Sequence, residues 1–84
     1  MEEITELERK VLKNLKRRRV FGAKHLSVDN AIRSGFPSHE RGEVRKAIYE
    51  LIKKGLIIYY DQGRKAIQLN KEKQDEIERL IRDY

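Results

Sequence analysis

Residues 38–70 hold the feature that most constrains the fold, because an amphipathic helix, a glycine and two strand-forming runs follow one another without a break. Apolar residues recur along residues 39–54 at the spacing of one helical face, and Gly55 predicts the end of that helix. The predicted buried stripe consists of Val44, Ala47, Ile48, Leu51 and Ile52. Such a stripe must be packed against other elements, so this helix organises the rest of the chain.

The residues after this helix predict a β-hairpin over residues 56–69. Leu56–Tyr60 and Arg64–Leu69 are rich in strand-forming residues. Asp61-Gln62-Gly63 lies between them and predicts a tight turn. We expect Gly63 to adopt the positive φ that such a turn requires.

Turn residues mark the start of the same helix. Ser38 is a good N-cap, and Glu40 suits the first turn of a helix. Just before them, Gly35 can take the left-handed conformation that closes a preceding helix, and Pro37 prevents that helix from continuing. We expect Phe36 to fill the core at this turn.

Two further helices are predicted upstream. The first runs over about residues 2–18, and the second over about residues 24–33 with Ser27 as its candidate N-cap. Between them, Val20–Ala23 is a candidate short strand beside the later hairpin. The apolar face of the first helix consists of Ile4, Leu7, Val11 and Leu15, with Leu12 on its flank.

A last helix is predicted over about residues 71–83, with Asn70 as its cap. Its apolar stripe consists of Ile77, Leu80, Ile81 and Tyr84. This helix and the one over residues 2–18 are natural packing partners, either within one chain or across a dimer.

The composition indicates a single domain, residues 1–84, with a modest core, since 38% of the residues are hydrophobic. Charged residues make up 40%, both signs are used freely, and cysteine is absent. That mixture is typical of a heat-adapted, thermophilic intracellular protein. No apolar run approaches the roughly 20 residues of a membrane span, and the acidic start is not a signal peptide. We therefore expect a cytoplasmic protein with no membrane partner.

The positive charge is unevenly distributed. The net charge is +6 and the sequence pI is about 9.7, which favours an acidic partner such as nucleic acid. Residues 1–8 carry four Glu and no base, whereas residues 9–25 carry eight Lys or Arg and no acid. The Arg17–Arg19 run has two interpretations: it suits the negative end of a helix dipole, or it contacts phosphates.

Catalytic patterns are missing from the sequence. His25 and His39 are the two histidines, and no His, Asp or Glu grouping shows metal-ligand spacing. The serines have no histidine at a suggestive spacing, and no glycine-rich phosphate loop is present. We expect a protein that is not an enzyme and that has no cofactor and no metal.

The order of predicted elements and three short stretches resemble the winged helix-turn-helix family of DNA-binding domains, especially its small stand-alone archaeal members. The stretches are Gly35–His39, Gly42–Val44 and Leu51–Ile57, and the resemblance covers roughly residues 5–70. It implies an α+β, mostly helical fold: a three-helix core with a short β-hairpin wing, here followed by an extra C-terminal helix.

The resemblance also implies a function and a site. In the family, the helix that corresponds to residues 39–54 enters the major groove and the wing contacts the flanking backbone, so the expected partner is double-stranded DNA and the expected role is transcription regulation. The residues that match this interface are Ser38, His39, Arg41, Gly42, Arg45, Lys46, Tyr49 and Lys53 from the helix and Arg64 and Lys65 from the wing.

The residue types give these positions different roles. Arginine has a fork that matches the two acceptors of guanine, whereas Lys46 and Lys53 are better placed as phosphate ligands. Gly42 costs about 1 kcal/mol relative to alanine inside a helix. Its presence has two readings: another molecule approaches the backbone closely there, or the first helical turn is frayed.

Other functions stay open at this level. Glu40, Glu43 and Glu50 lie in the same helix and are awkward beside DNA, which favours a protein–protein interaction module without direct DNA binding. RNA binding is less favoured because the sequence lacks an aromatic platform for bases. A homodimer through the first or the C-terminal helix would double a short DNA footprint.

Overall fold

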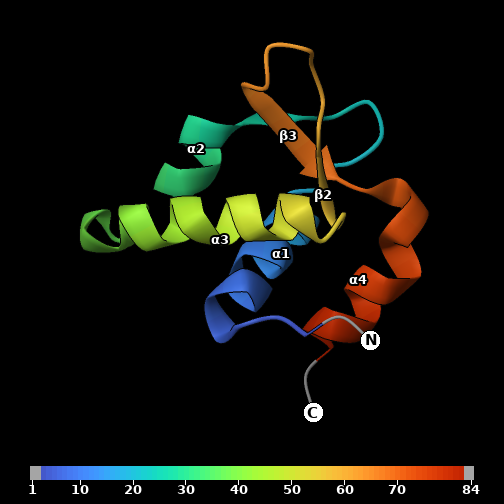
Figure 1. Ribbon diagram of the computed structural model, residues 1–84, viewed down its shortest axis with the longest axis horizontal. Helices are drawn as coiled ribbons and strands as arrows, with labels where there is room; N and C mark the ends of the chain where they lie inside the picture. Colours follow the sequence, from blue (N-terminus) through green and yellow to red (C-terminus); the bar gives the residue numbers. More distant parts are fainter. Residues whose placement is uncertain (1–2, 83–84) are drawn as a thin grey trace.

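The computed structural model describes residues 3–82, a range in which four α-helices and three short strands form an α+β fold. In Figure 1, α3 crosses the front, α2 and the sheet lie above it, and α1 runs behind and below it with α4 at its side. In chain order the elements are α1 Glu6–Arg17, β1 Leu26–Ser27, α2 Val28–Arg33, α3 Arg41–Lys53, β2 Ile57–Tyr59, β3 Ala66–Leu69 and α4 Gln74–Ile81.

A capping box fixes the start of α1. The Thr5 hydroxyl accepts the backbone N–H of Glu8, and the Glu8 carboxylate accepts the backbone N–H of Thr5. The predicted start near residue 2 is therefore wrong for the described residues 3–5, which precede the helix, while residue 2 itself lies outside the described range. Leu12, expected on the flank, is fully buried.

The chain leaves α1 through two hydrogen bonds that close the helix end. Val20 N–H donates to the Leu15 carbonyl and Arg19 N–H to that of Lys16, with Arg19 at φ 58°. The predicted strand over Val20–Ala23 is wrong, although the Val20 carbonyl accepts the N–H of Leu69 on β3. The strand instead forms at β1.

Ser27 caps α2, as predicted, because its hydroxyl accepts the Asn30 N–H at 3.0 Å. The helix is shorter than the predicted range 24–33, since residues 26 and 27 belong to β1. Gly35 takes the predicted left-handed conformation at φ 84°. Phe36 is half-buried and packs against the core.

The α3 helix begins later than predicted. Ser38–Glu40 first forms a 3-10 turn, in which the Glu40 N–H donates to the Pro37 carbonyl, and Ser38 makes no capping hydrogen bond. The helix end is as predicted: Gly55 has φ 79°, and the chain closes with hydrogen bonds to the carbonyls of the last turn. The predicted stripe is buried except for Ile52, which is half-buried.

The three strands form an antiparallel sheet in the order β1-β3-β2. Ile57 pairs with Leu69 and Tyr59 with Ile67, while Leu26 on β1 pairs with Ile67 from the other side. The strand β2 is one residue shorter than its predicted run at each end, and β3 begins two residues later than predicted but ends at Leu69 as predicted. Ile57, Ile67 and Leu69 face the core.

The hairpin turn differs from the prediction in one residue. Gly63 does not take the positive φ, and Arg64 does, at 59°. The reason lies in Asp61, whose carbonyl accepts the Arg64 N–H and whose Oδ1 accepts the N–H groups of Lys65 and Ala66. These bonds turn the chain at Arg64.

The C-terminal segment packs on α1 within the same chain. Asn70 caps it as predicted, but by accepting the Glu72 N–H at the start of a 3-10 turn, Lys71–Lys73, before α4 begins. Ile77 is buried, and Lys16 Nζ on α1 lies 2.7 Å from Glu78 Oε1. Tyr84 and the end of the predicted range 71–83 lie outside the described residues. Among residues 3–82, no helix has the length and apolarity that crossing a membrane would require.

Candidate nucleic-acid interface

The outer face of α3 is fully open to solvent. The helix buries Val44, Ile48 and Leu51 on its inner side, and the residues on the other side are exposed. All ten residues predicted as the interface are exposed, namely Ser38, His39, Arg41, Gly42, Arg45, Lys46, Tyr49, Lys53, Arg64 and Lys65. The structure therefore leaves each of them accessible to a partner.

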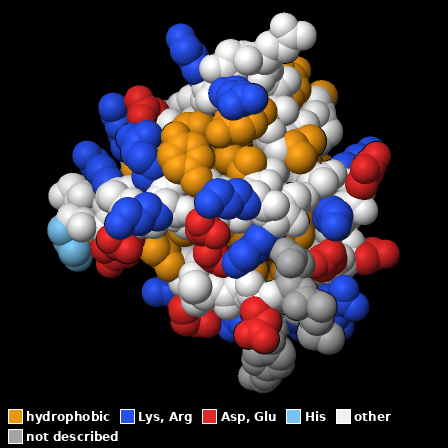
Figure 2. All heavy atoms as spheres, in the orientation of Figure 1, with side chains coloured by type: hydrophobic (Ala, Val, Ile, Leu, Met, Phe, Trp, Pro, Cys, Tyr) orange, Lys and Arg blue, Asp and Glu red, His pale blue; other side chains and the backbone are white. Residues whose placement is uncertain are grey.

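Charged side chains of both signs lie along this face (Figure 2). In Figure 2, Lys and Arg side chains follow α3 with acidic side chains between them, and an apolar patch lies between α3 and the hairpin. Tyr49 on α3 is 40% exposed. The face that carries the predicted interface is thus mixed in charge, with an apolar centre.

Two of the acidic side chains pair with lysines one turn away. Glu43 Oε1 lies 3.9 Å from Lys46 Nζ, and Glu50 Oε2 lies 3.5 Å from Lys53 Nζ. All four side chains are at least half exposed, so each pair stabilises the helix by only about 0.3–0.5 kcal/mol. The lysines can exchange these partners for a phosphate at small cost.

Arg45 and Gly42 lie beside α2. Arg45 Nη2 is 3.9 Å from Asp29 Oδ1, a contact between the first turn of α2 and α3. Both residues help to line a shallow hollow of about 240 Å³ with Arg41 and Arg33. A Cβ built on Gly42 meets no atom within 4 Å, so the glycine is not required by packing inside the protein.

The hairpin presents its basic residues through a turn that Asp61 organises. Hydrogen bonds from the backbone N–H of Ala66 and then of Lys65, with a smaller contribution from the charge of His25, lower the pKa of Asp61 below its ordinary value of 3.8. The Arg64 guanidinium lies 5.8 Å from the centre of the Tyr59 ring. Arg64 is thus held against the hairpin and still exposed.

An aromatic stack on the hairpin was not predicted. The rings of His25 and Tyr60 are parallel, with centroids 3.9 Å apart and planes 16° apart. His25 precedes β1 and Tyr60 follows β2, so only the sheet pairing brings them together. No local sequence signal could have found this contact or the ion pair between Asp29 and Arg45.

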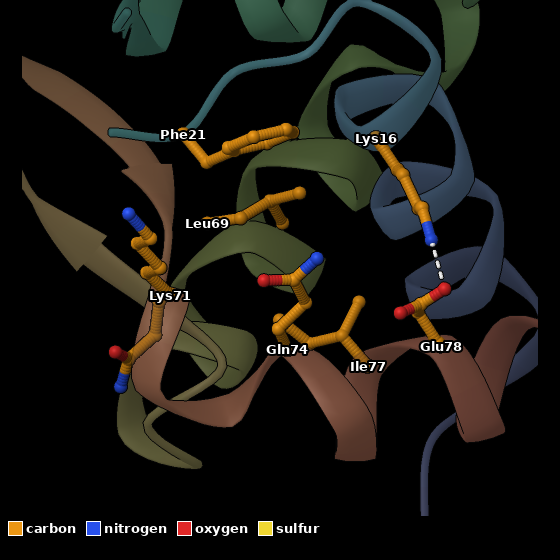
Figure 3. A pocket seen from close by; sticks show the side chains of 8 residues that line it. Lys16, Phe21, Leu69, Lys71, Gln74, Ile77 and Glu78 are labelled. Atoms are coloured by element: carbon orange, nitrogen blue, oxygen red, sulfur yellow. Dashed lines mark ion pairs between the residues drawn. The ribbon is translucent and has the colours of Figure 1, made fainter. Parts of the chain in front are cut away.

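A small cavity lies away from this face, between α1, β3 and α4. Figure 3 shows Phe21, Leu69 and Ile77 around it, with the ion pair of Lys16 and Glu78 at its edge. That pair, through the lysine's hydrogen bond and charge, lowers the pKa of Glu78. The cavity measures about 20 Å³, room for a single water molecule.

Among residues 3–82, no three His, Cys, Asp or Glu side chains converge in a way that could hold a metal ion. Comparison with models of known protein families, with curated proteins and with solved structures finds no match to this chain.

Proposed function

We propose that the protein is a DNA-binding winged helix-turn-helix domain that acts as a small transcription regulator. In this proposal α2 and α3 form the helix-turn-helix, and the hairpin of β2 and β3 is the wing. The observation that carries it is the outer face of α3, where Arg41, Arg45 and Lys46 are exposed beside a basic hairpin while the opposite side is buried.

The residue roles follow from this geometry. An α-helix fits the major groove, and arginine can donate two hydrogen bonds to guanine, so Arg41 and Arg45 are the proposed base readers. Lys46 and Lys53 are the proposed phosphate ligands. Arg64 and Lys65 extend the contact to the flanking backbone. The open space over Gly42 supports close approach of a base or sugar to the helix backbone.

The glutamates on α3 do not oppose the proposal strongly. Glu43 and Glu50 are paired with lysines of the same helix in the free protein. Because these exposed pairs are weak, DNA phosphates can take the lysines over. The two carboxylates then lower the affinity for every duplex whose backbone approaches them, because phosphates carry no sequence information.

Titration of a labelled random duplex at about 50 mM and 200 mM salt tests the proposal, since binding through phosphates weakens steeply with salt. The double variant Arg45→Gln/Lys46→Gln should bind at least roughly tenfold more weakly than wild type at the lower salt concentration. The variant Lys71→Gln/Arg79→Gln removes the same charge from exposed sites on the C-terminal segment and should bind as wild type does. Equal weakening in both variants would show that only net charge matters.

A second candidate function is a protein–protein interaction module. Tyr49 and Tyr60 are 40% and 46% exposed, and an apolar patch lies between α3 and the hairpin. Exposed tyrosines beside charged residues are common in protein interfaces. Absence of duplex binding even at about 50 mM salt would favour this function over DNA binding.

A further inference from the structure

A basic cleft lies between α1 and the turn that joins α2 to α3. It encloses about 320 Å³. Its walls are formed by Lys10, Lys13, Asn14 and Arg17 of α1 and by Gly35, Phe36, Pro37 and Glu40 of the turn. The α1 wall of the cleft belongs to the segment with eight bases and no acid, residues 9–25, and the proposed function makes no use of it.

The cations of this cleft form a row. Lys10, Lys13 and Arg17 are three and four residues apart, so they follow one side of α1 over about 10 Å of helix axis. Leu12 and Leu15 lie on the opposite, buried side. A straight row of cations of this length suits a linear polyanion, whose phosphates also recur along a line.

A buried amide holds the arginine in place. Arg17 Nη2 donates to Asn14 Oδ1 at 3.0 Å, and Asn14 Nδ2 donates to the Ser34 carbonyl at 2.9 Å. Asn14 is 9% exposed, whereas Arg17 is exposed. One edge of the guanidinium is therefore anchored to the protein. Its other N–H groups, like the Lys10 ammonium, have no partner among the described residues.

The electrostatic balance of the cleft is positive. Glu40 is the one carboxylate among the lining residues of the described chain, and it lies 3.7 Å from His39 Nε2. Lys10 and Arg17 together outnumber this carboxylate, which favours an anion. Arg18 and Arg19 continue the exposed basic surface past the end of α1.

The cleft meets the proposed interface at the turn, where Pro37 and Glu40 line the cleft and Ser38 and His39 lie between them in the chain. Leu12 and Leu15 of α1 share one core with Val44 and Ile48 of α3, so the exposed sides of the two helices point in different directions. We propose that the α1 cleft binds the phosphate backbone of a separate nucleic-acid duplex, so that one domain links two duplex segments. The evidence for binding at the cleft is the geometry of the cleft, whereas the linking of two duplexes rests on the proposed function.

A two-duplex capture assay tests this proposal. One duplex is immobilised on beads, and a second, fluorescent duplex is added with the protein. Wild type should retain the fluorescent duplex, and Lys10→Gln/Arg17→Gln should retain at least roughly tenfold less because two phosphate ligands are lost. The same variant should bind a single duplex within about twofold of wild type. The matched variant Lys71→Gln/Arg79→Gln should behave as wild type in both assays.

Chemical shifts of the wild-type protein give a second test, which holds even if the variant folds poorly. In ¹⁵N-labelled wild type, the Asn14 side-chain amide, which bonds to Ser34, should shift during the second equivalent of duplex and not during the first. Amides of α3 should shift during the first. The proposal is overturned if Lys10→Gln/Arg17→Gln captures as wild type does, or if it loses single-duplex affinity in parallel with capture.

Failure of the two proposals gives different results. If Arg45→Gln/Lys46→Gln binds duplex as wild type does while Lys10→Gln/Arg17→Gln does not bind, a single duplex is bound at the cleft, and both the proposed function and the linking of two duplexes fail. If wild type binds one duplex through α3 and never captures a second, the cleft proposal fails and the proposed function stands. Two-duplex capture by a dimer of the 10.0 kDa chain would survive the α1 substitutions, and so would also overturn the cleft.

Discussion

Lys53 and Lys54 are neighbours at the end of α3, but their ammonium groups lie in different surroundings. Lys54 Nζ is 2.8 Å from Glu8 Oε1 and 2.8 Å from the Glu3 carbonyl oxygen, and its side chain is 23% exposed. Lys53 Nζ is 3.5 Å from Glu50 Oε2, and its side chain is 75% exposed. One lysine joins α3 to α1, and the other belongs to the outer face.

The difference separates two uses of charge in one small domain. The pairs Glu8–Lys54 and Lys16–Glu78 join separate elements, are at least partly shielded from solvent and have short contacts. The lysines on the outer face of α3, Lys46 and Lys53, make longer contacts within the helix and stay solvated. Substitutions in the first group should therefore change stability, and those in the second group should change binding.

The largest expected effect is on the Glu8–Lys54 pair. Lys54→Met leaves the buried Glu8 carboxylate without its cation, which should lower the free energy of unfolding by roughly 2–3 kcal/mol. For a domain of this size, that is a fall in melting temperature on the order of 10–20 °C. Lys53→Met should change the free energy of unfolding by less than about 0.5 kcal/mol. Thermal unfolding followed by circular dichroism measures both.

A double-mutant cycle sharpens this result. Glu8→Gln keeps an acceptor for the Thr5 N–H, so the capping box survives without the charge. The double variant Glu8→Gln/Lys54→Met should recover part of the stability that Lys54→Met loses, because no unpaired charge remains. Additive losses would mean that the two side chains do not interact, and the comparison of the two lysines would fail.

Local patterns predicted the parts of the fold that local chemistry determines. The buried stripe of α3 and its end at Gly55 follow from residue spacing and from the conformational freedom of glycine. The N-cap of α1 at Thr5 could also have been predicted, because Thr5-Glu6-Leu7-Glu8 is a capping-box sequence. The predicted helix was too long because acidic residues, which suit a first helical turn, also precede Thr5.

Features that depend on distant pairing could not be predicted. Two residues are too few to identify β1 as a strand, and its partner β3 is about 40 positions away. The bond between Glu8 and Lys54 joins residues 46 positions apart. For the candidate interface, the amphipathic pattern predicted which side of α3 is exposed, whereas the hollow beside Asp29 and the cleft on α1 arise only when helices pack.

A smaller effect is expected at Gly42, on the outer face. Gly42→Ala should raise the free energy of unfolding by about 0.5–1 kcal/mol, because alanine favours the helix and its Cβ meets no protein atom within 4 Å. The same substitution should weaken duplex binding if DNA approaches the helix backbone there. A stabilised variant with wild-type affinity in the salt titration would remove Gly42 from the interface.

The smallest expected effect is a loosening of the hairpin in acid. It tests whether the hairpin depends on the charge of Asp61, which takes part in neither of the two kinds of ion pair compared above. Backbone N–H groups of Ala66 and Lys65 hold the pKa of Asp61 below its ordinary value of 3.8. Because the folded pKa lies below the unfolded one, the carboxylate stabilises the hairpin fully above pH 3.8, and that contribution disappears as the pH falls through the folded pKa. Amide exchange at Lys65 and Ala66 should therefore accelerate below about pH 4, after correction for intrinsic exchange.

Asp61→Asn keeps an acceptor oxygen without a titrating group, so its corrected exchange should not change over this range. Identical pH profiles in the two proteins would show that the Asp61 charge does not hold the turn.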